Sequence, residues 1–261
     1  MGDHQPADSR GGEVGRGGST DATLDILSGT GDPVLWRSES DSGQSDAINK
    51  AFVASSGEII GWLNSDDAYY DSKVVEDVVA FFRAHPAVDV VYGHSLQITA
   101  EGNAIQVLWA PPFDADLQRA VNLQVQPSTF VRRRALRDPM LDTSLHFAMD
   151  YELWLRLAAE GREFGRVDRI LSVDRHQLDR KSATIKDVLF GDLERLAPKY
   201  DLHLGPEYNR QRTAFYRRQR LMGAMLIPGI HPDRVAFTPG PHMKAGLWRR
   251  QIGSRRTAWP K

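Results

Sequence analysis

The chain has 261 residues, of which 41% are hydrophobic and 26% charged, which is the composition of a globular protein. It contains no cysteine, and this excludes disulfides, thiolate zinc sites and cysteine nucleophiles and fits a reducing compartment. The first residues lack the apolar segment of a secretory signal, and residues 1–16 are polar and glycine-rich. We therefore expect a disordered leader and a cytoplasmic protein.

The net charge of −1 conceals a basic C-terminal part. Residues 206–261 hold twelve Lys and Arg side chains against two Asp and Glu. Such a segment can meet nucleic acid, an anionic membrane surface or the acidic remainder of the chain. Because basic and aromatic residues do not interleave on strands here, we expect no nucleic-acid partner and favour peripheral contact at the inner face of a membrane. The alternative is that these arginines are simply solvated.

Hydrophobic periodicity predicts alternating helices and strands as far as residue 182, and helices alone from there to residue 226. A glycine following a helical segment predicts a helix end at Gly57 and at Gly161. The sequence Glu101-Gly102-Asn103 predicts a hairpin turn. The expected helices cover 22–27, a segment around 48–55, 72–85, 150–159, 185–200 and 207–226, and the expected strands cover 34–37, 59–63, 88–92, 96–99, 104–109, 128–132 and 170–173.

This order of elements predicts an α/β fold with a mostly parallel, Rossmann-like sheet flanked by helices. The hairpin adds a small antiparallel part, and the last two helices form a helical C-terminal extension. In the second of these helices, Tyr208, Phe215, Met222 and Met225 or Leu226 share one stripe that we expect to be buried.

The stretch EIIGWLNSDDAYY, residues 58–70, combines a short apolar run with two adjacent carboxylates. The run from Ile59 to Leu63 is typical of a buried central strand in a parallel sheet. Ligands bind such sheets beyond the carboxyl ends of the strands, which is where Asp66 and Asp67 would lie. Two neighbouring carboxylates suit a hard divalent cation that also contacts phosphate oxygens. The alternative is that the pair caps a helix or stabilises a turn.

Six segments, in this order and spacing, resemble the family 2 glycosyltransferases of the GT-A fold: GGSTDATLDIL, SESDSGQSDAINKAF, GEIIGWLNSDDAYY, QPSTFVRR, HFAMDYELWLRLA and DRHQLDRKS. The resemblance covers residues 17–182. It implies an inverting transfer of a sugar from a nucleotide diphosphate sugar, commonly a UDP-sugar, with Mg²⁺ or Mn²⁺ holding the diphosphate. The implied acceptor is a saccharide, a lipid-linked or another hydroxyl, as in polysaccharide or cell-envelope biosynthesis.

The resemblance also assigns roles to individual residues. Asp66 and Asp67 fall on the metal-binding motif, with Asn64 where the family often has a leading Asp, and His176 is a further candidate metal ligand. Asp150 falls on the catalytic base, and its alternative role is that of a helix N-cap. The implied donor-binding residues are Asp41, Gly43, Gln44, Asp46, Asn64 and Asp66, of which those in the 41–46 segment could instead only cap an amphipathic helix.

By the same resemblance the chain divides into a leader (1–16), a GT-A-like domain (17–183) and a basic extension (184–261). The family's first strand-helix-strand unit has no counterpart here, and Arg16 stands where the family has an Asp that contacts the nucleoside. We therefore expect this chain alone to bind UDP-sugars weakly and to be marginally stable. An alternative hypothesis is an inactive relative that acts as a binding or scaffold module.

Overall fold

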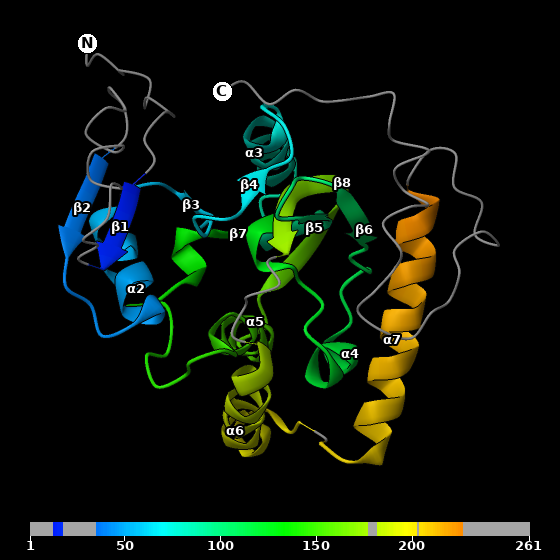
Figure 1. Ribbon diagram of the computed structural model, residues 1–261. Helices are drawn as coiled ribbons and strands as arrows, with labels where there is room; N and C mark the ends of the chain where they lie inside the picture. The colour runs from blue at the N-terminus through cyan, green and yellow to red at the C-terminus, as the bar shows by residue number, and fades with distance from the viewer. Residues whose placement is uncertain (1–12, 18–34, 177–181, 203, 227–261) are drawn as a thin grey trace, which may run out of the picture.

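The computed structural model describes residues 13–17, 35–176, 182–202 and 204–226 (Figure 1). The helix expected over 22–27 and the tail beyond residue 226 lie outside these residues. The described elements are β1 (Glu13–Gly17), β2 (Leu35–Glu39), α2 (Gln44–Ala54), β3 (Ile59–Ile60), β4 (Ala68–Tyr69), α3 (Val74–Ala84), β5 (Val88–Thr99), β6 (Ala104–Leu108), α4 (Ala115–Ala120), η1 (Gln126–Ser128), β7 (Thr129–Arg132), η2 (Arg133–Ala135), α5 (Met149–Ala159), β8 (Glu163–His176), α6 (Ser182–Tyr200) and α7 (Pro206–Met225).

Strands β1 and β2 form a small parallel sheet of their own, with α2 beside them (Figure 1). Residues 13–17 pair in register with residues 35–39. This corrects the expectation of a disordered leader up to residue 16, because the pairing gives the backbone of 13–17 hydrogen-bond partners. A glycine-rich composition therefore did not prevent strand formation here.

The remaining described strands form one sheet in the order β3-β7-β5-β8-β4, with β6 attached to β5. The α/β class and the predicted hairpin are confirmed, with Gly102 at a φ of 84° between β5 and β6. The expected parallel majority is wrong for these strands, because only β5 and β8 pair in parallel within this sheet. The strands expected at 88–92 and 96–99 join into the long β5, whose hairpin partner and whose neighbour β7 both run antiparallel to it.

The expected central strand at 59–63 is reduced to two residues at the edge of this sheet. From β3 the chain passes to β4, at the opposite end of the hydrogen-bonded strand order. Residues 61–67, which we call the crossover loop, make this connection. Within the described sheet β3 pairs with β7 alone. Accordingly, Ile59 and Ile60 are only half-buried and Leu63 is exposed.

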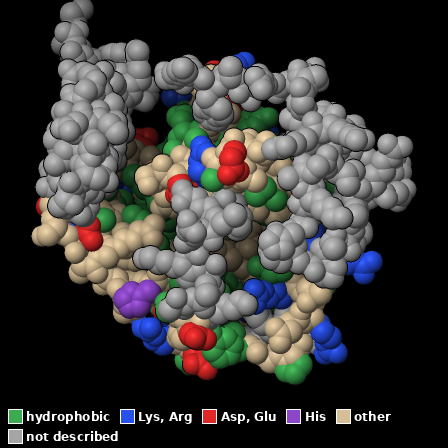
Figure 2. All heavy atoms as spheres, viewed as in Figure 1, with side chains coloured by type: hydrophobic (Ala, Val, Ile, Leu, Met, Phe, Trp, Pro, Cys, Tyr) green, Lys and Arg blue, Asp and Glu red, His purple; other side chains and the backbone are tan. Residues whose placement is uncertain are grey.

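Helices cover the sheet from two sides. The core beneath α3 combines its buried face with residues of three strands, namely Val74, Val78, Phe82, Val91, Phe130 and Leu171. The larger core surrounds α5, where Leu153, Trp154 and Leu157 are fully buried. Figure 2 draws one side of the molecule. It shows hydrophobic side chains in the middle of that side and charged side chains of both signs toward its lower edge.

The two predicted glycine helix ends differ in outcome. Gly161 has a φ of 72° directly after α5, as expected for a glycine that ends a helix. Gly57 is not among the described residues with positive φ, because α2 already ends at Ala54 and continues through an extended Ser55. The prediction for Gly57 is therefore wrong.

Helix α7 packs on β6 and α4 along a stripe that differs from the expected one. Phe215 is buried, as predicted, but Met225 is 58% exposed. The buried positions on α7 instead include Gln219 and Gly223, which follow Phe215 at intervals of four residues. A Cβ atom at Gly223 would lie 2.1 Å from the carbonyl oxygen of Val107, so the absence of a side chain allows the helix backbone to approach β6.

Two glycine substitutions, one in α6 and one in α7, should change stability in opposite directions. Gly223→Ala should lower the free energy of unfolding by about 1–3 kcal/mol, because the methyl group would clash with backbone that cannot rotate away. Gly191→Ala in α6 should raise it by about 0.5–1 kcal/mol, because its Cβ would meet open space and alanine favours helix. Urea unfolding of both variants measures this. Equal changes of the same sign would contradict the packing described for α7.

Candidate functional site

The side chain of Asn64, in the crossover loop, connects three segments of the chain. Its Oδ1 accepts a hydrogen bond from Gln44 Nε2 at 2.9 Å. Its Nδ2 donates to Asp67 Oδ2 and to Gln126 Oε1, each at 3.1 Å. Gln126 in turn donates through Nε2 to the carbonyl oxygen of Trp62 at 2.6 Å. One carboxamide thus joins the start of α2, the Asp66–Asp67 turn and the segment before β7.

The segment 41–46 forms the turn that leads into α2, whose N-cap Gly43 supplies no side-chain capping hydrogen bond. Asp41 Oδ1 accepts from the Gly43 N–H at 3.0 Å, and Asp46 Oδ2 accepts from the Ser42 N–H at 2.9 Å. The hydrogen bond from Ser42 is the main cause that lowers the pKa of Asp46. Gly43 adopts a φ of 137°, which a residue with a side chain rarely does. The turn therefore exposes backbone at the beginning of α2.

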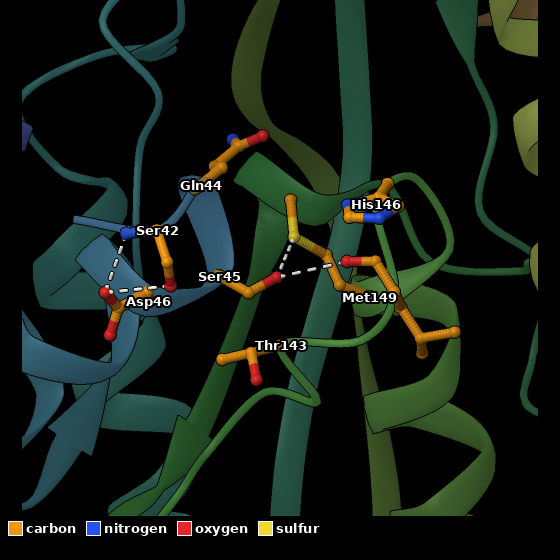
Figure 3. Close-up of a pocket in the computed structure, with 9 residues that line it drawn as sticks. Ser42, Gln44, Ser45, Asp46, Thr143, His146 and Met149 are labelled. Atoms are coloured by element: carbon orange, nitrogen blue, oxygen red, sulfur yellow. Dashed lines mark hydrogen bonds between the residues drawn. The ribbon is translucent and has the colours of Figure 1, made fainter.

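A shallow pocket lies between the start of α2 and the segment before α5 (Figure 3). Ser45 and Met149 face each other in it, with the Ser45 hydroxyl 2.9 Å from the Met149 sulfur. Asn49 fixes the two sides together, because its amide donates to the Leu141 carbonyl and accepts from the Leu141 N–H at 2.9 and 2.8 Å. The lining residues are Ser42, Gly43, Gln44, Ser45, Asp46, Thr143, Leu145, His146 and Met149.

Asp150 follows Met149 of this pocket at the beginning of α5. Its Oδ1 accepts from the Tyr151 N–H at 2.7 Å and its Oδ2 from Asn122 Nδ2 at 3.2 Å. Burial raises the pKa of the Asp150 carboxyl, and these two hydrogen bonds oppose that rise. A carboxylate with a raised pKa is a stronger base than an exposed one.

The backbone that leads into α5 is held by Asp192 of α6. Its side chain is fully buried, and its Oδ2 accepts from the N–H groups of His146, Phe147 and Ala148 at 3.0, 2.8 and 3.0 Å. Of these three donors, the N–H of Ala148 belongs to the N-cap of α5, where no side chain supplies a capping hydrogen bond, and the other two lie directly before it. Asp192 therefore fixes the backbone from which Met149 and Asp150 project.

The donor set of the Asp66–Asp67 turn fits a divalent cation that is shared with a substrate. Both carboxylates are half-buried and adjacent. Among the described residues, no three Asp, Glu, His or Cys side chains gather as a metal-binding group. Ions such as Mg²⁺ are commonly held by one or two carboxylates together with substrate phosphates, and need no third protein ligand. His176 ends β8, but its side chain lies outside the described part of the chain.

Several site residues were not assigned a role from the sequence. Asn122 and Gln126 contact the predicted functional side chains directly, and Asp192 holds the backbone before Asp150. A signal was present in the carboxamides at 118, 122, 124 and 126, which lie in one short segment. Nothing in the local sequence of α6 distinguishes Asp192 from the exposed Asp187.

The sequence model described as Glycosyl transferase family 2 matches residues 16–149, more than half of the chain. The chain belongs to glycosyl transferase family 2. Among curated relatives, the PGL/p-HBAD biosynthesis glycosyltransferases of Mycobacterium tuberculosis and Mycobacterium bovis are 31% identical over 104 residues, which is 38% of this chain. The match covers 39% of the length of those relatives.

The fold can be compared with solved structures of similar proteins. Glucosyl-3-phosphoglycerate synthase from Mycobacterium tuberculosis, in complex with Mn²⁺, UDP and phosphoglyceric acid, superposes with a TM-score of 0.50 at 17% identity over 73% of this chain and 68% of that one. TarS from S. aureus, in complex with UDP-GlcNAc, has a TM-score of 0.49 at 15% identity over 80% and 72% of the two chains. The first of these two comparisons shows that this family 2 member has a GT-A-like fold.

The raised pKa of Asp150 predicts a pH-dependent difference between the native chain and Asp150→Asn. The native state holds the Asp150 proton more tightly than the unfolded chain, so the stability from this group is present below the ordinary value of 3.8 and is lost as pH rises through the raised pKa. The asparagine of the variant cannot ionise, and Asn122 can rotate its amide to accept from it. The variant should therefore gain thermal stability relative to the native chain as pH rises from about 4 through that raised pKa.

Thermal melts of both proteins between pH 4 and 8 measure this difference. Asp187→Asn, at an exposed position of α6, is the control and should show no such trend. A stability difference that does not grow with pH would contradict the raised pKa of the Asp150 carboxyl.

Proposed function

We propose that this protein transfers a sugar from a UDP-sugar to an acceptor hydroxyl by a single inverting displacement assisted by Mg²⁺ or Mn²⁺. The observation that carries the proposal is the hydrogen-bonded path through Asn64 and Gln126. It brings the start of α2 and the Asp66–Asp67 turn together, and the same 118–126 segment contacts Asp150 through Asn122. Membership of glycosyl transferase family 2 supports the reaction class.

The donor half of the proposed site comprises the turn at Gly43, Gln44, Asn64 and the two carboxylates. The N-terminus of α2 carries partial positive charge and suits the diphosphate. Gln44 and Asn64 offer amide groups to the nucleotide or the sugar. The GT-A-like structure with a TM-score of 0.50 was determined with Mn²⁺ and UDP, which supports both components of the proposal.

Asp66 and Asp67 would hold the cation, with His176 as a proposed further ligand. The register of β4 against β8 supports this third ligand, because the β8 backbone beyond Val173 runs toward the residues before Ala68. A bound cation would offset the negative charge that accumulates on the departing diphosphate.

The acceptor half is built around Asp150. The acceptor oxygen forms a bond to the anomeric carbon while the bond from that carbon to the diphosphate oxygen breaks and its electron pair leaves with UDP. Asp150 takes the proton of the acceptor hydroxyl as general base. Its raised pKa favours this transfer, and Asp192 holds the backbone directly before the helix turn that carries Asp150. Attack from the face opposite the leaving group inverts the configuration.

The location of the protein and its acceptor stay predictions. No helix among the described residues is long and apolar enough to cross a bilayer. In α7, residues Arg210, Arg212, Arg217, Arg218 and Arg220 are exposed, which is the basis for the proposed peripheral membrane contact. A saccharide or a lipid-linked hydroxyl remains the proposed acceptor.

Two sets of variants test the proposed roles separately. Asp66→Asn combined with Asp67→Asn should abolish UDP binding that depends on Mn²⁺, because the cation loses its anionic protein ligands. Asp150→Asn should keep that affinity but lower the rate of UDP release from UDP-sugars in the presence of acceptor by on the order of 10²-fold or more. Calorimetry measures the affinity, and a UDP-detection assay measures the rate.

The control for the double variant is Glu58→Gln combined with Glu76→Gln, which removes the same charge at two exposed positions. Unchanged UDP affinity in the Asp66 and Asp67 variant would refute the metal assignment. A parallel loss of UDP affinity in Asp150→Asn would show that Asp150 has a structural role instead.

A further inference from the structure

Four carboxamides lie within nine residues, from α4 to the start of η1: Gln118, Asn122, Gln124 and Gln126. We call these four residues the carboxamide row. Asn122 contacts Asp150, and Gln126 contacts Asn64 in the crossover loop. The hydroxyl of Tyr151 donates to the backbone carbonyl of Gln118 at 2.6 Å, which fixes the beginning of the row against α5. The row therefore extends from the proposed base to the proposed metal site.

Most of the amide atoms in this row are buried without a hydrogen-bond partner. Gln118 is fully buried and Gln124 is 3% exposed, and neither the Oε1 nor the Nε2 atom of either side chain has a partner. Asn122 Oδ1 is also buried and has no hydrogen-bond partner. A buried polar group left without a partner costs about 1–3 kcal/mol, and native proteins contain few of them. Five such atoms within seven residues indicate a segment whose amide groups bind a ligand and not another part of the chain.

The chemistry of the row defines its ligand. It offers three oxygen acceptors and two N–H₂ donors and carries no charge of its own. Arg119, the charged residue within the segment, is exposed and paired with Asp116 on the surface. Hydroxyl groups both donate and accept hydrogen bonds, so a ring with several hydroxyls matches this set, whereas a phosphate needs donors or positive charge.

We propose that the carboxamide row binds the ring of a neutral saccharide, which places a ring hydroxyl beside Asp150. The identification of this saccharide as the acceptor rests on the proposed function, but the binding of a neutral sugar by the row does not. The inference narrows the substrate class: the acceptor is an uncharged glycoside and not a phosphorylated small molecule.

Saturation-transfer NMR titrations of the full chain test this with methyl glucoside, methyl mannoside and methyl galactoside, and with glycerol 3-phosphate as the anionic comparison. At least one neutral glycoside should bind more tightly than glycerol 3-phosphate. Gln118→Met and Gln124→Met, which keep the side-chain length, should each weaken that glycoside about tenfold, the effect of one or two lost hydrogen bonds. Gln211→Met, at an exposed position of α7, is the matched control and should change nothing.

The melting temperature separates a sugar site from a site for buried water. Replacing amides that have no protein partner should leave the melting temperature unchanged or raise it. Unchanged glycoside affinity in both Met variants overturns the proposal, as does a melting temperature lowered without loss of glycoside binding. If the Met variants do not fold, Gln118→Asn and Gln124→Asn keep an amide but withdraw it by one methylene, and unchanged affinity there overturns the proposal too.

Calorimetry with UDP and Mn²⁺ on the same proteins distinguishes this inference from the proposed function. Both Met variants should bind UDP as the unmodified chain does. If the unmodified chain binds glycosides through the row but does not bind UDP, the proposed function fails and the saccharide site stands. If it binds UDP but none of the glycosides, the saccharide site fails and the donor site stands.

Discussion

The crossover loop, residues 61–67, determines where the functional groups lie. Strand β3 stands at one end of the hydrogen-bonded strand order and β4 at the other, and this loop joins them. Asn64, Asp66 and Asp67 are carried by this loop and not by the tip of a central strand. The hydrogen bonds of Gln126 to Trp62 and Asn64 hold the loop against the segment that precedes β7. A parallel β5–β8 pair at the middle of the sheet supplies the fixed base for this arrangement.

The other half of the site depends on contacts between helices that are distant in sequence. Asp192 of α6 accepts three backbone N–H groups before α5. Further along α5, the buried Glu152 pairs with Arg156 and with Lys199 of α6, at 3.4 and 2.9 Å. These interactions offset the cost of burying the charges and align α5 relative to α6. Helix α6, although it belongs to the region described from sequence as an extension, therefore stabilises the beginning of the helix that carries Asp150.

The sequence allowed the prediction of the α/β class, most elements and the hairpin at Gly102, because these follow from local periodicity and turn chemistry. Through the family resemblance it also led to the prediction that Asp66, Asp67 and Asp150 share one site, and this common site and their roles stay proposals. The position of β3 at an edge could not be predicted, because an apolar run of five residues does not specify its neighbours. The contacts of Asn64 with Gln126 and of Asp192 with the backbone before α5 join residues that are far apart in the chain. No local sequence pattern predicts such contacts.

The central claim is that the Asp66–Asp67 turn and Asp150 face the same bound donor. A crystal structure of the chain with UDP and Mn²⁺, with the metal located by its anomalous scattering, tests this most directly. The account predicts a single peak within about 2–2.5 Å of a carboxylate oxygen of Asp66 or Asp67, with the diphosphate between that peak and the start of α2. It also predicts that the β-phosphate oxygen to which the donor sugar would be attached is directed toward Asp150. A metal peak bound away from the crossover loop, or a UDP whose β-phosphate points away from Asp150, would contradict it.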